Sequence, residues 1–360
     1  MKRKTLDIKE NYPLREHTTF KTGGPARYFA RADDEYHIAE AYAFAEERKV
    51  PLFVLGGGSN ILISDKGFPG LAVLNRIKGI DSRIEKGSAF VTAGAGEDWD
   101  NFVKQCTGNN WQGLECLSGI PGTAGAAPVQ NIGAYGRSVD GSISEVRVFD
   151  SHTGEFVTLL NRECGFCYRG SIFNSVSAGR YVITQVTFKL TPGGAPCLTY
   201  QELIKRFTSD ADITPGRVRD AIIEIRDRKG LLLLEGHESY RSAGSFFKNP
   251  AIPAEQFGKV ERIIQEENCC TNWAWPLPSG GMKVSAACLI QCAGFARGHR
   301  SGNAGLSPRH TLVLVNYGDA TAAEIVAFAR QVQERVKAKF GVALMPEVQL
   351  VGFLPQEGLS

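Results

Sequence analysis

The chain lacks the long apolar runs and the charge excess that are typical of membrane-spanning and nucleic-acid-binding proteins. No apolar run approaches the ~18 residues of a membrane helix, and residues 1–20 have no continuous apolar segment of the kind that a secretory signal carries. The 41 basic and 38 acidic side chains leave a formal charge of only +3, which is too small to predict a nucleic-acid surface. We therefore expect neither a membrane nor a nucleic acid as a partner.

Three common nucleotide-binding and hydrolase motifs are also missing. Gly56-x-Gly58 and Gly94-x-Gly96 both lack the third glycine of the dinucleotide fingerprint. The P-loop pattern G-x-x-x-x-G-K-[ST] and the nucleophile motif G-x-S-x-G do not occur. These absences argue against a Rossmann dehydrogenase, a P-loop NTPase and an α/β-hydrolase.

Metal-binding and disulfide patterns are weak. The six histidines never form H-x-x-x-H, and only Cys164-x-x-Cys167 and Cys288-x-x-x-Cys292 have ligand spacing. Because structural zinc normally shows a tighter set of four ligands, we expect no metal, with a metal site or a redox pair as open alternatives. Nine cysteines, an odd number, fit free thiols better than a disulfide framework. We therefore expect a reducing, cytoplasmic location.

The 360 residues predict two or three domains that mix helices and strands. Apolar spacing predicts helices over 35–48, from Trp99 onwards, over 218–228 and over 321–340, with Thr321 as the cap and Gly341 as the stop of the last. Short strands are predicted at 52–55, 61–63, 89–93, 144–150, 155–160 and 181–190, and a domain boundary after 191–194.

Glycine is abundant, and its excess is concentrated. The 40 glycines gather at Gly56-Gly57-Gly58, at Gly94 and Gly96, and between Gly113 and Gly136. Glycine is needed where backbone approaches a ligand closely or adopts a positive φ. Such loops can form anion-binding nests for a diphosphate, or they can be tight turns packed into a core, and both readings stay open on spacing alone.

Six segments, in this order, resemble the UDP-N-acetylenolpyruvoylglucosamine reductase (MurB) family over about residues 11–352. They are PLFVLGGGSNILIS, VTAGAGEDW, GLECLSGIPGTAGAAPVQNIGAYG, ECGFCYRGSIF, AGSFFKNP and MPEVQLVG. The resemblance implies an α+β protein with an FAD-binding fold of the vanillyl-alcohol-oxidase (PCMH) type in two subdomains, plus an α+β substrate-binding domain. The expected divisions are 1–75 for the first FAD-binding subdomain, 76–215 for the second and 216–341 for the substrate-binding domain. The C-terminal segment 342–360 is a candidate to return to the first subdomain.

The resemblance also implies cofactors and site residues. FAD would bind non-covalently, and NADPH would be the hydride-donating co-substrate. The implied FAD-binding residues are Gly56, Gly57, Gly58, Ser59, Asn60, Ile120, Pro121, Gly122, Gln130, Asn131, Gly133 and Tyr135. The implied catalytic residues are Arg169, which would neutralise the enolpyruvate carboxylate and the enolate, Ser245 as the proton donor, and Glu347, which would help to polarise the intermediate. The implied substrate-binding residues are Tyr168, Tyr200, Lys229, Asn249, Trp275, Lys283 and His310.

The reaction implied is reduction of UDP-N-acetylglucosamine enolpyruvate to UDP-N-acetylmuramate in peptidoglycan synthesis. Cys167, where glycine is expected, and Met345, where an acid is expected, put fine substrate geometry in doubt. The alternatives are an FAD oxidase of the same fold, which often tethers its flavin covalently, and a catalytically silent nucleotide-sugar binding protein. No obligate protein partner is expected.

Overall fold

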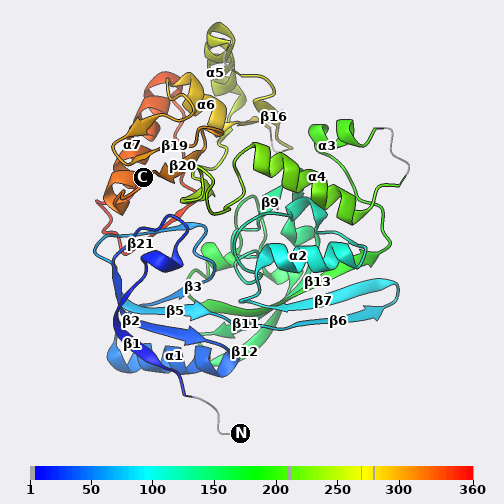
Figure 1. Cartoon of the computed structure of the whole chain (residues 1–360), viewed down its shortest axis with the longest axis vertical. Helices are drawn as coiled ribbons and strands as arrows, with labels where there is room; N and C mark the ends of the chain where they lie inside the picture. Colours follow the sequence, from blue (N-terminus) through cyan, green and yellow to red (C-terminus); the bar gives the residue numbers. More distant parts are fainter. Residues whose placement is uncertain (1–4, 209–211, 269, 279, 360) are drawn as a thin grey trace. The chain divides into compact units, whose positions relative to one another are not determined.

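The computed structural model describes residues 5–208, 212–268, 270–278 and 280–359 (Figure 1). The chain divides into two compact units. The first unit comprises residues 1–12, 26–58 and 68–227, and the second comprises 13–25, 59–67 and 228–360. The three-part division expected from the resemblance stays a prediction.

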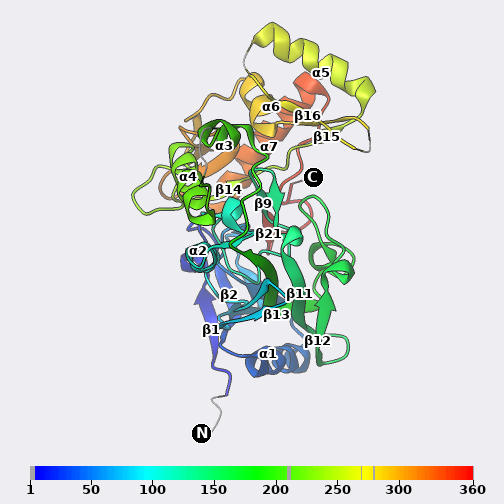
Figure 2. The ribbon, with the colours of Figure 1, turned by 90° about the vertical axis from the view of Figure 1, so that its right-hand side faces the viewer.

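One sheet of the first unit contains parallel strands joined by a helix. Its strand order is β1-β2-β5-β3, with β1 at Ile8–Pro13, β2 at Pro25–Ala32, β5 at Phe68–Asn75 and β3 at Leu52–Leu55. Strands β2 and β3 both run parallel to β5, and α1 (Glu35–Arg48) connects β2 to β3 and packs on the sheet (Figure 2). Ile38, Ala41 and Ala45 of α1 are buried in this core, as their helical spacing predicts.

A second sheet of the first unit is antiparallel. Its order is β12-β11-β13-β7-β6, with β6 at Ile80–Glu85, β7 at Ser88–Gly94, β11 at Ile143–Asp150, β12 at Glu155–Leu160 and β13 at Tyr181–Pro192. The short β8 (Trp111–Gln112) pairs with the end of β13. Helix α2 (Trp99–Gly108) covers this sheet, because the rings of Trp99 and Phe102 lie 5.8 and 5.0 Å from that of Phe188.

Two further helices complete the first unit. Helices α3 (Gln201–Arg206) and α4 (Pro215–Arg228) share a small apolar core. That core also contains Cys116 from the segment between β8 and β9 (Gly133–Ala134), which pairs with β10 (Arg137–Ser138). The chain's 3-10 helices are at Arg15–His17, Glu115–Leu117, Val139–Gly141, Asn161–Glu163 and Ile172–Asn174.

The described part of the second unit contains three small sheets. An antiparallel sheet has the order β14-β20-β19-β18, with β14 at Ser242–Ser245, β20 at Val313–Asn316, β19 at Ala304–Leu306 and β18 at Arg300–Ser301. Another has the order β15-β17-β16, with β15 at Ala251–Ile252, β17 at Met282–Val284 and β16 at Ala274–Pro276. The third pairs β21 (Gln349–Val351) in parallel with β4 (Ile61–Ile63), so the chain's C-terminal segment returns to an early strand.

Helix α7 (Ala322–Phe340) organises the core of the second unit. The Thr321 hydroxyl accepts a hydrogen bond from the N–H of Glu324, whose carboxylate accepts one from the N–H of Thr321. Asp65 adds a second cap, since its carboxylate accepts hydrogen bonds of 2.8 and 2.9 Å from the first-turn N–H groups. The helix ends at Gly341, which has a φ of 70°. Helices α5 (Ala254–Glu267) and α6 (Ala286–Cys292) share its core.

The cysteines differ from the expectation of free thiols throughout. Cys270 and Cys288 are joined by a disulfide, because the tertiary fold brings together two positions that their sequence spacing does not relate. Among the described residues, no helix combines the length and the apolar character that a membrane crossing requires.

Candidate active site

The loop after β3 approaches a second glycine-rich loop more closely than any side chain permits. A Cβ atom at Gly57 would lie 2.8 Å from the Cα of Gly122, and one at Gly56 would lie 2.9 Å from Oγ1 of Thr123. Gly58 adopts the left-handed region with a φ of 63°. Bare backbone N–H groups in such loops can surround an anion. The structure thus brings two predicted cofactor loops together, and their glycines fit a diphosphate group.

The second loop is held in place by the backbone at the end of β7. The N–H of Trp99 donates to the carbonyl of Gly122 at 3.1 Å, and the N–H of Ala124 donates to the carbonyl of Glu97 at 2.9 Å. Ile120 packs on the core of this unit, while Pro121 and Gln130 are half-buried. The loop is therefore a fixed part of the first unit.

Asn131 and Arg169 connect this loop to a tight turn. The buried Asn131 side chain donates to the carbonyl of Cys167 at 3.0 Å and accepts from the N–H of Asp140 at 3.1 Å. Nη2 of Arg169 donates to the carbonyl of Gly133 at 2.8 Å. A predicted catalytic arginine and two predicted flavin-lining residues are thereby brought together.

The turn at Arg169 has an unusual backbone. Arg169 has a φ of 53°, and Cys167 and Gly170 exchange two backbone hydrogen bonds around it. A Cβ atom at Gly170 would lie 2.7 Å from the sulfur of Cys167, so the glycine makes room for the cysteine. The neighbouring Tyr168 is exposed, and its ring lies 5.8 Å from the Arg169 guanidinium. A residue other than glycine in this conformation costs about 1–3 kcal/mol, and such strained residues are concentrated at functional sites.

A buried arginine that the sequence analysis missed supports the same loop. Nε of Arg226, on α4, donates to the carbonyl of Gly119 at 3.0 Å, and its side chain is hydrogen-bonded to Tyr135. Burial lowers the pKa of Arg226, an effect that Tyr135 opposes. The rings of Tyr135 and Tyr200 meet edge to face at 5.2 Å. Tyr135, implied to bind FAD, therefore contacts Tyr200, implied to bind the substrate.

Helix α4 is anchored to α2 by an ion pair. Both carboxylate oxygens of Asp100 accept 2.6 Å hydrogen bonds from Arg219. Burial by itself raises the pKa of Asp100, but the hydrogen bonds from Arg219 and from the N–H of Gly119 outweigh it and lower the pKa. Neither Asp100 nor Arg219 has a sequence motif that could have revealed the pair.

In the second unit, the backbone places Ser245 beside Glu347. Ser245 is the last residue of β14, and the carbonyl of the next residue, Phe246, accepts a hydrogen bond of 2.8 Å from the N–H of Glu347. Phe246 and Phe247 are fully buried and hold this segment in the core. Nδ2 of Asn60 donates to the carbonyl of Glu347 at 3.1 Å. The fold therefore makes neighbours of Ser245, the predicted proton donor, Glu347, the predicted acid, and Asn60. Ser59, directly before Asn60 in the chain, belongs to the same unit.

His310 is half-buried beside positive charges. Burial, followed by the charges of Lys229 and Arg297, lowers the pKa of His310 to about 4. Its Nδ1 accepts a hydrogen bond of 3.2 Å from the N–H of Leu312, so the neutral ring carries its proton on Nε2. Two predicted substrate-binding residues are thus close together, and Arg297 is an additional cation that no motif indicated.

The remaining predicted substrate-binding residues lie around β16 and β17. Trp275 faces Lys283 in the register of these strands, and Nζ of Lys283 lies 5.9 Å from the Trp275 ring. The side-chain oxygen of Asn249 accepts a hydrogen bond of 2.9 Å from the N–H of Ala286, at the start of α6. Trp275 is 41% exposed, so part of its side chain is accessible to solvent.

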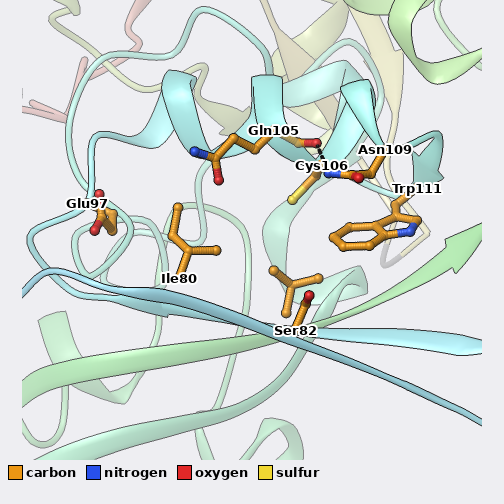
Figure 3. Close-up of a pocket in the computed structure, with 8 residues that line it drawn as sticks. Ile80, Ser82, Glu97, Gln105, Cys106, Asn109 and Trp111 are labelled. Atoms are coloured by element: carbon orange, nitrogen blue, oxygen red, sulfur yellow. Dashed lines mark hydrogen bonds between the residues drawn. The ribbon is translucent and has the colours of Figure 1, made fainter.

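A hollow in the first unit does not coincide with the predicted site. Figure 3 shows it between α2 and the hairpin of β6 and β7, with Glu97, Gln105 and Trp111 among its lining residues. None of the predicted FAD-binding, catalytic or substrate-binding residues lines it. The roles assigned to those residues from the resemblance stay predictions, and they divide between the two units.

The comparisons with known proteins identify the family. The family model "UDP-N-acetylenolpyruvoylglucosamine reductase, C-terminal domain" matches residues 236–351, and the model "FAD binding domain" matches residues 26–160. A UDP-N-acetylenolpyruvoylglucosamine reductase of Thermobifida fusca is 37% identical over 97% of this chain and 99% of its own length. One from Chromobacterium violaceum is 40% identical over 95% and 98%.

A solved structure agrees at the level of the fold. The crystal structure of UDP-N-acetylenolpyruvylglucosamine reductase from Thermus caldophilus matches with a TM-score of 0.63 at 24% identity, over 96% of this chain and 98% of that one. The family, the α+β FAD-binding fold and the FAD cofactor that the six segments predicted are confirmed. The chain therefore belongs to the UDP-N-acetylenolpyruvoylglucosamine reductase family, whose members are FAD-dependent oxidoreductases.

Proposed function

We propose that this chain catalyses the NADPH-dependent, FAD-mediated reduction of UDP-N-acetylglucosamine enolpyruvate to UDP-N-acetylmuramate. The main supporting observation is that the N–H of Glu347 donates to the carbonyl of Phe246, the residue after Ser245, and that the Asn60 side chain donates to the carbonyl of Glu347. This arrangement supports one reaction centre for the proton donor and the acid. FAD, reduced by NADPH, would supply the hydride for the substrate double bond. The product is a precursor of peptidoglycan, so the reaction belongs to cell-wall synthesis.

The glycine loops would hold the FAD diphosphate. The contact between Gly57 and Gly122 leaves no room for a Cβ atom, so the backbone N–H groups on both loops can face the phosphate oxygens. Asn131, Gly133 and Tyr135 would line the flavin from the second loop. The hydrogen bonds of Asn131 to Cys167 and Asp140 preset the position of that loop before the cofactor binds.

Arg169 would bind the substrate carboxylate and stabilise the negative charge that grows on it. A guanidinium stays protonated and offers a planar pair of donors that matches a carboxylate. The hydrogen bond from Nη2 to Gly133 restrains the side chain, and the left-handed backbone restrains the turn that carries it. Glu347 would polarise the same intermediate.

Ser245 would donate the proton from its Oγ to the carbon next to the carboxylate. A serine hydroxyl is a weak acid in water, so this transfer depends on geometry and on stabilisation of the resulting alkoxide. The buried Phe246 and the hydrogen bond to Glu347 restrain the backbone directly after Ser245. The half-buried position of Ser245 also limits competition from water.

The uridine diphosphate would bind to the second unit's cations and to an aromatic ring. Lys229 and Lys283 offer positive charge, Trp275 offers a partly exposed ring for stacking, and Asn249 offers an amide beside α6. His310 would donate from Nε2 without carrying a charge. Tyr168 and Tyr200, which belong to the first unit, stay predicted substrate-binding residues.

The small-molecule substrate is the only partner we propose. The small net charge of +3 supports the absence of a nucleic-acid partner. A cytoplasmic location is part of the proposal, and the thiols of Cys106, Cys116, Cys164, Cys167 and Cys197 support it.

Anaerobic stopped-flow absorbance of the purified FAD-loaded protein tests the function in two steps. NADPH should bleach the oxidised flavin band, and UDP-N-acetylglucosamine enolpyruvate should then restore it. Flavin that is released by acid precipitation would agree with this function, whereas covalently retained flavin would favour a sugar or alcohol oxidase. A protein that takes up no FAD, or whose flavin NADPH leaves unchanged, would overturn the proposal.

A further inference from the structure

Three cysteines of the second unit gather at one place although they come from separate segments. Cys288 and Cys292 lie one turn apart on α6, and Cys270 follows the left-handed Asn268 that ends α5. Their sulfur atoms all lie within 4.8 Å of one another. Cys270 is half-buried, and the other two are buried. No role in the reaction proposed above uses any of them.

Two of the three sulfur–sulfur spacings are those of ligands around one metal ion, and the third pair, Cys270 and Cys288, is the disulfide, which must open on reduction before both sulfurs can bind a metal. Sγ of Cys292 lies 3.9 Å from Sγ of Cys270 and 3.9 Å from Sγ of Cys288. Zinc binds thiolates at ~2.3 Å in tetrahedral geometry, which places neighbouring sulfurs about 3.8 Å apart. The two measured separations agree with that edge length.

Disulfide formation and metal binding compete for these sulfur atoms. Cys270 and Cys288 are joined as a disulfide, and Cys292 is disulfide-bonded as well. Making a disulfide removes two protons and two electrons from two thiols, so it requires an oxidant. Binding of Zn²⁺ releases one proton for each thiol and transfers no electrons. The redox state of the compartment therefore decides which form exists.

The other cysteines indicate a reducing compartment. All five described cysteines outside the cluster are free thiols, including the closely spaced Cys164 and Cys167. Thiols that persist in this way are typical of proteins kept reduced in the cell. In that environment the gathered sulfurs of the second unit are available as soft ligands.

We propose that Cys270, Cys288 and Cys292 bind one Zn²⁺ in the reduced protein, with a further ligand or water in the fourth position. Cys269 lies outside the described residues, and the proposal does not depend on it. Three thiolates around Zn²⁺ carry a net negative charge. Lys339 lies beside the cluster, since its Nζ donates to the carbonyl of Cys292 at 2.6 Å, and the same Nζ is paired with the carboxylate of Glu267.

The metal would fix the two strands that carry predicted substrate-binding residues. Strands β16 and β17 lie between Cys270 and Cys288 in the chain, and they present Trp275 and Lys283. The N–H of Ser285 donates to the carbonyl of Trp273 at 2.7 Å, which closes the base of this segment. A site that binds both ends would restrain the segment in between. This consequence rests on the proposed function, whereas the metal site itself does not.

Metal analysis of protein purified in the presence of a thiol reductant tests the proposal. Inductively coupled plasma mass spectrometry should find about one zinc per chain, and Cys288→Ser and Cys292→Ser should lose it. Cys197→Ser is the matched control, because Cys197 is an exposed free thiol of the first unit, and it should keep its zinc. Circular dichroism and FAD content check that each variant is folded.

Cobalt(II) provides a test that needs no variant. Stripped, reduced wild-type protein should bind one Co²⁺ and develop thiolate-to-cobalt charge-transfer absorbance, and bound metal should protect three thiols from alkylation. Zinc removal should raise KM for the UDP-sugar several-fold while leaving flavin reduction by NADPH unchanged. Reduced protein that binds neither zinc nor cobalt, or equal zinc loss in Cys197→Ser, would overturn the site. Zinc binding in a protein without reductase activity would refute the proposed function and leave the metal site standing.

Discussion

The N–H of Glu347 donates a hydrogen bond of 2.8 Å to the carbonyl oxygen of Phe246, the residue directly after Ser245. This contact joins two segments that are about a hundred residues apart in the chain. Phe246 is fully buried, so it cannot move without disturbing the core of the second unit. The side chains of Ser245 and Glu347 are therefore carried on a rigid base, as a reaction that depends on close proton-transfer geometry requires.

Replacement of Ser245 by alanine should separate the two half-reactions. Reduction of FAD by NADPH needs no proton from Ser245 and should proceed nearly unchanged. Reoxidation by the enolpyruvate substrate should slow by ~10²–10⁴, the usual effect of losing a general acid. Stopped-flow absorbance at the oxidised flavin band measures each half separately, and Ser245→Cys should restore part of the second.

Ser82→Ala is the matched control for this variant. Ser82 is an exposed serine on β6 of the first unit, whereas Ser245 belongs to the second unit. It should behave as wild type in both halves. Equal slowing of both halves in Ser245→Ala would indicate damaged folding or flavin binding. Unchanged reoxidation would remove Ser245 from the mechanism.

Arg169→Lys should lower turnover more than it lowers substrate affinity. Lysine keeps the charge but loses the paired donors, and it cannot reproduce the contact from Nη2 to Gly133. Steady-state kinetics should show a large fall in kcat with a smaller rise in KM. The exposed Arg162 lies nearby in the chain, and Arg162→Lys should alter neither constant. Wild-type turnover in Arg169→Lys would place the arginine away from the reacting carboxylate.

Elements with strong local signals could be predicted from the sequence. Helix α7 has helical apolar spacing, and its capping box at Thr321 and its stop at Gly341 are both visible as residue types. Strands β7, β11, β12 and β13 of the first unit's antiparallel sheet were predicted for the same reason, because alternating or continuous apolar runs mark them. The fully exposed strand β6 of the same sheet carries no such run and was missed. Helix α5 was not predicted, although its buried residues Val260 and Ile264 have the helical spacing that the sequence shows.

Features that depend on tertiary contacts could not be predicted. Strands of two residues such as β15 and β18 carry too little periodicity to be recognised. An arginine such as Arg226 is expected at the surface, and only the packing of α4 shows that it is buried and hydrogen-bonded to Gly119. The meeting of Cys270 with Cys288 and Cys292 follows no ligand spacing in the sequence. The site residues were proposed from the order of six motifs, whereas the contact between Phe246 and Glu347 required the fold.

Gly57→Ala should weaken FAD binding. The new Cβ atom would lie 2.8 Å from the Cα of Gly122, and backbone on both sides must shift to relieve the clash. Overpacking of this kind costs about 1–3 kcal/mol, which corresponds to a loss of affinity of roughly 5- to 150-fold if the loops relax in the free protein. Titration of FAD into stripped protein measures the effect directly.

Gly108→Ala controls for a general effect of removing a glycine. A Cβ atom at Gly108 would have no heavy atom within 4 Å, so this variant should bind FAD as wild type does. The thermal stability of both apoproteins should be compared at the same time. Wild-type FAD affinity in Gly57→Ala would show that the close approach of the two loops does not form the diphosphate site.

His310 should make the folded protein less stable in mild acid. Burial, together with the charges of Lys229 and Arg297, lowers the pKa of His310 to about 4, whereas a histidine in the unfolded chain titrates near ~6.5. The unfolded state therefore binds the additional proton over this interval. The stability due to His310 is fully present above pH ~6.5 and is lost progressively as the pH falls towards about 4, by roughly 3 kcal/mol in total.

His310→Asn should flatten this part of the profile, because asparagine does not titrate and its side-chain oxygen can still accept from the N–H of Leu312. Denaturant midpoints measured from pH 8 to pH 5 should converge for variant and wild type as the pH falls, since only wild type loses this contribution. The exposed His152 supplies the matched control, and His152→Asn should follow wild type throughout. A constant difference between His310→Asn and wild type across the range would mean that His310 has the same affinity for its proton in the folded and unfolded chains. The neutral donor proposed for the substrate site would then not exist.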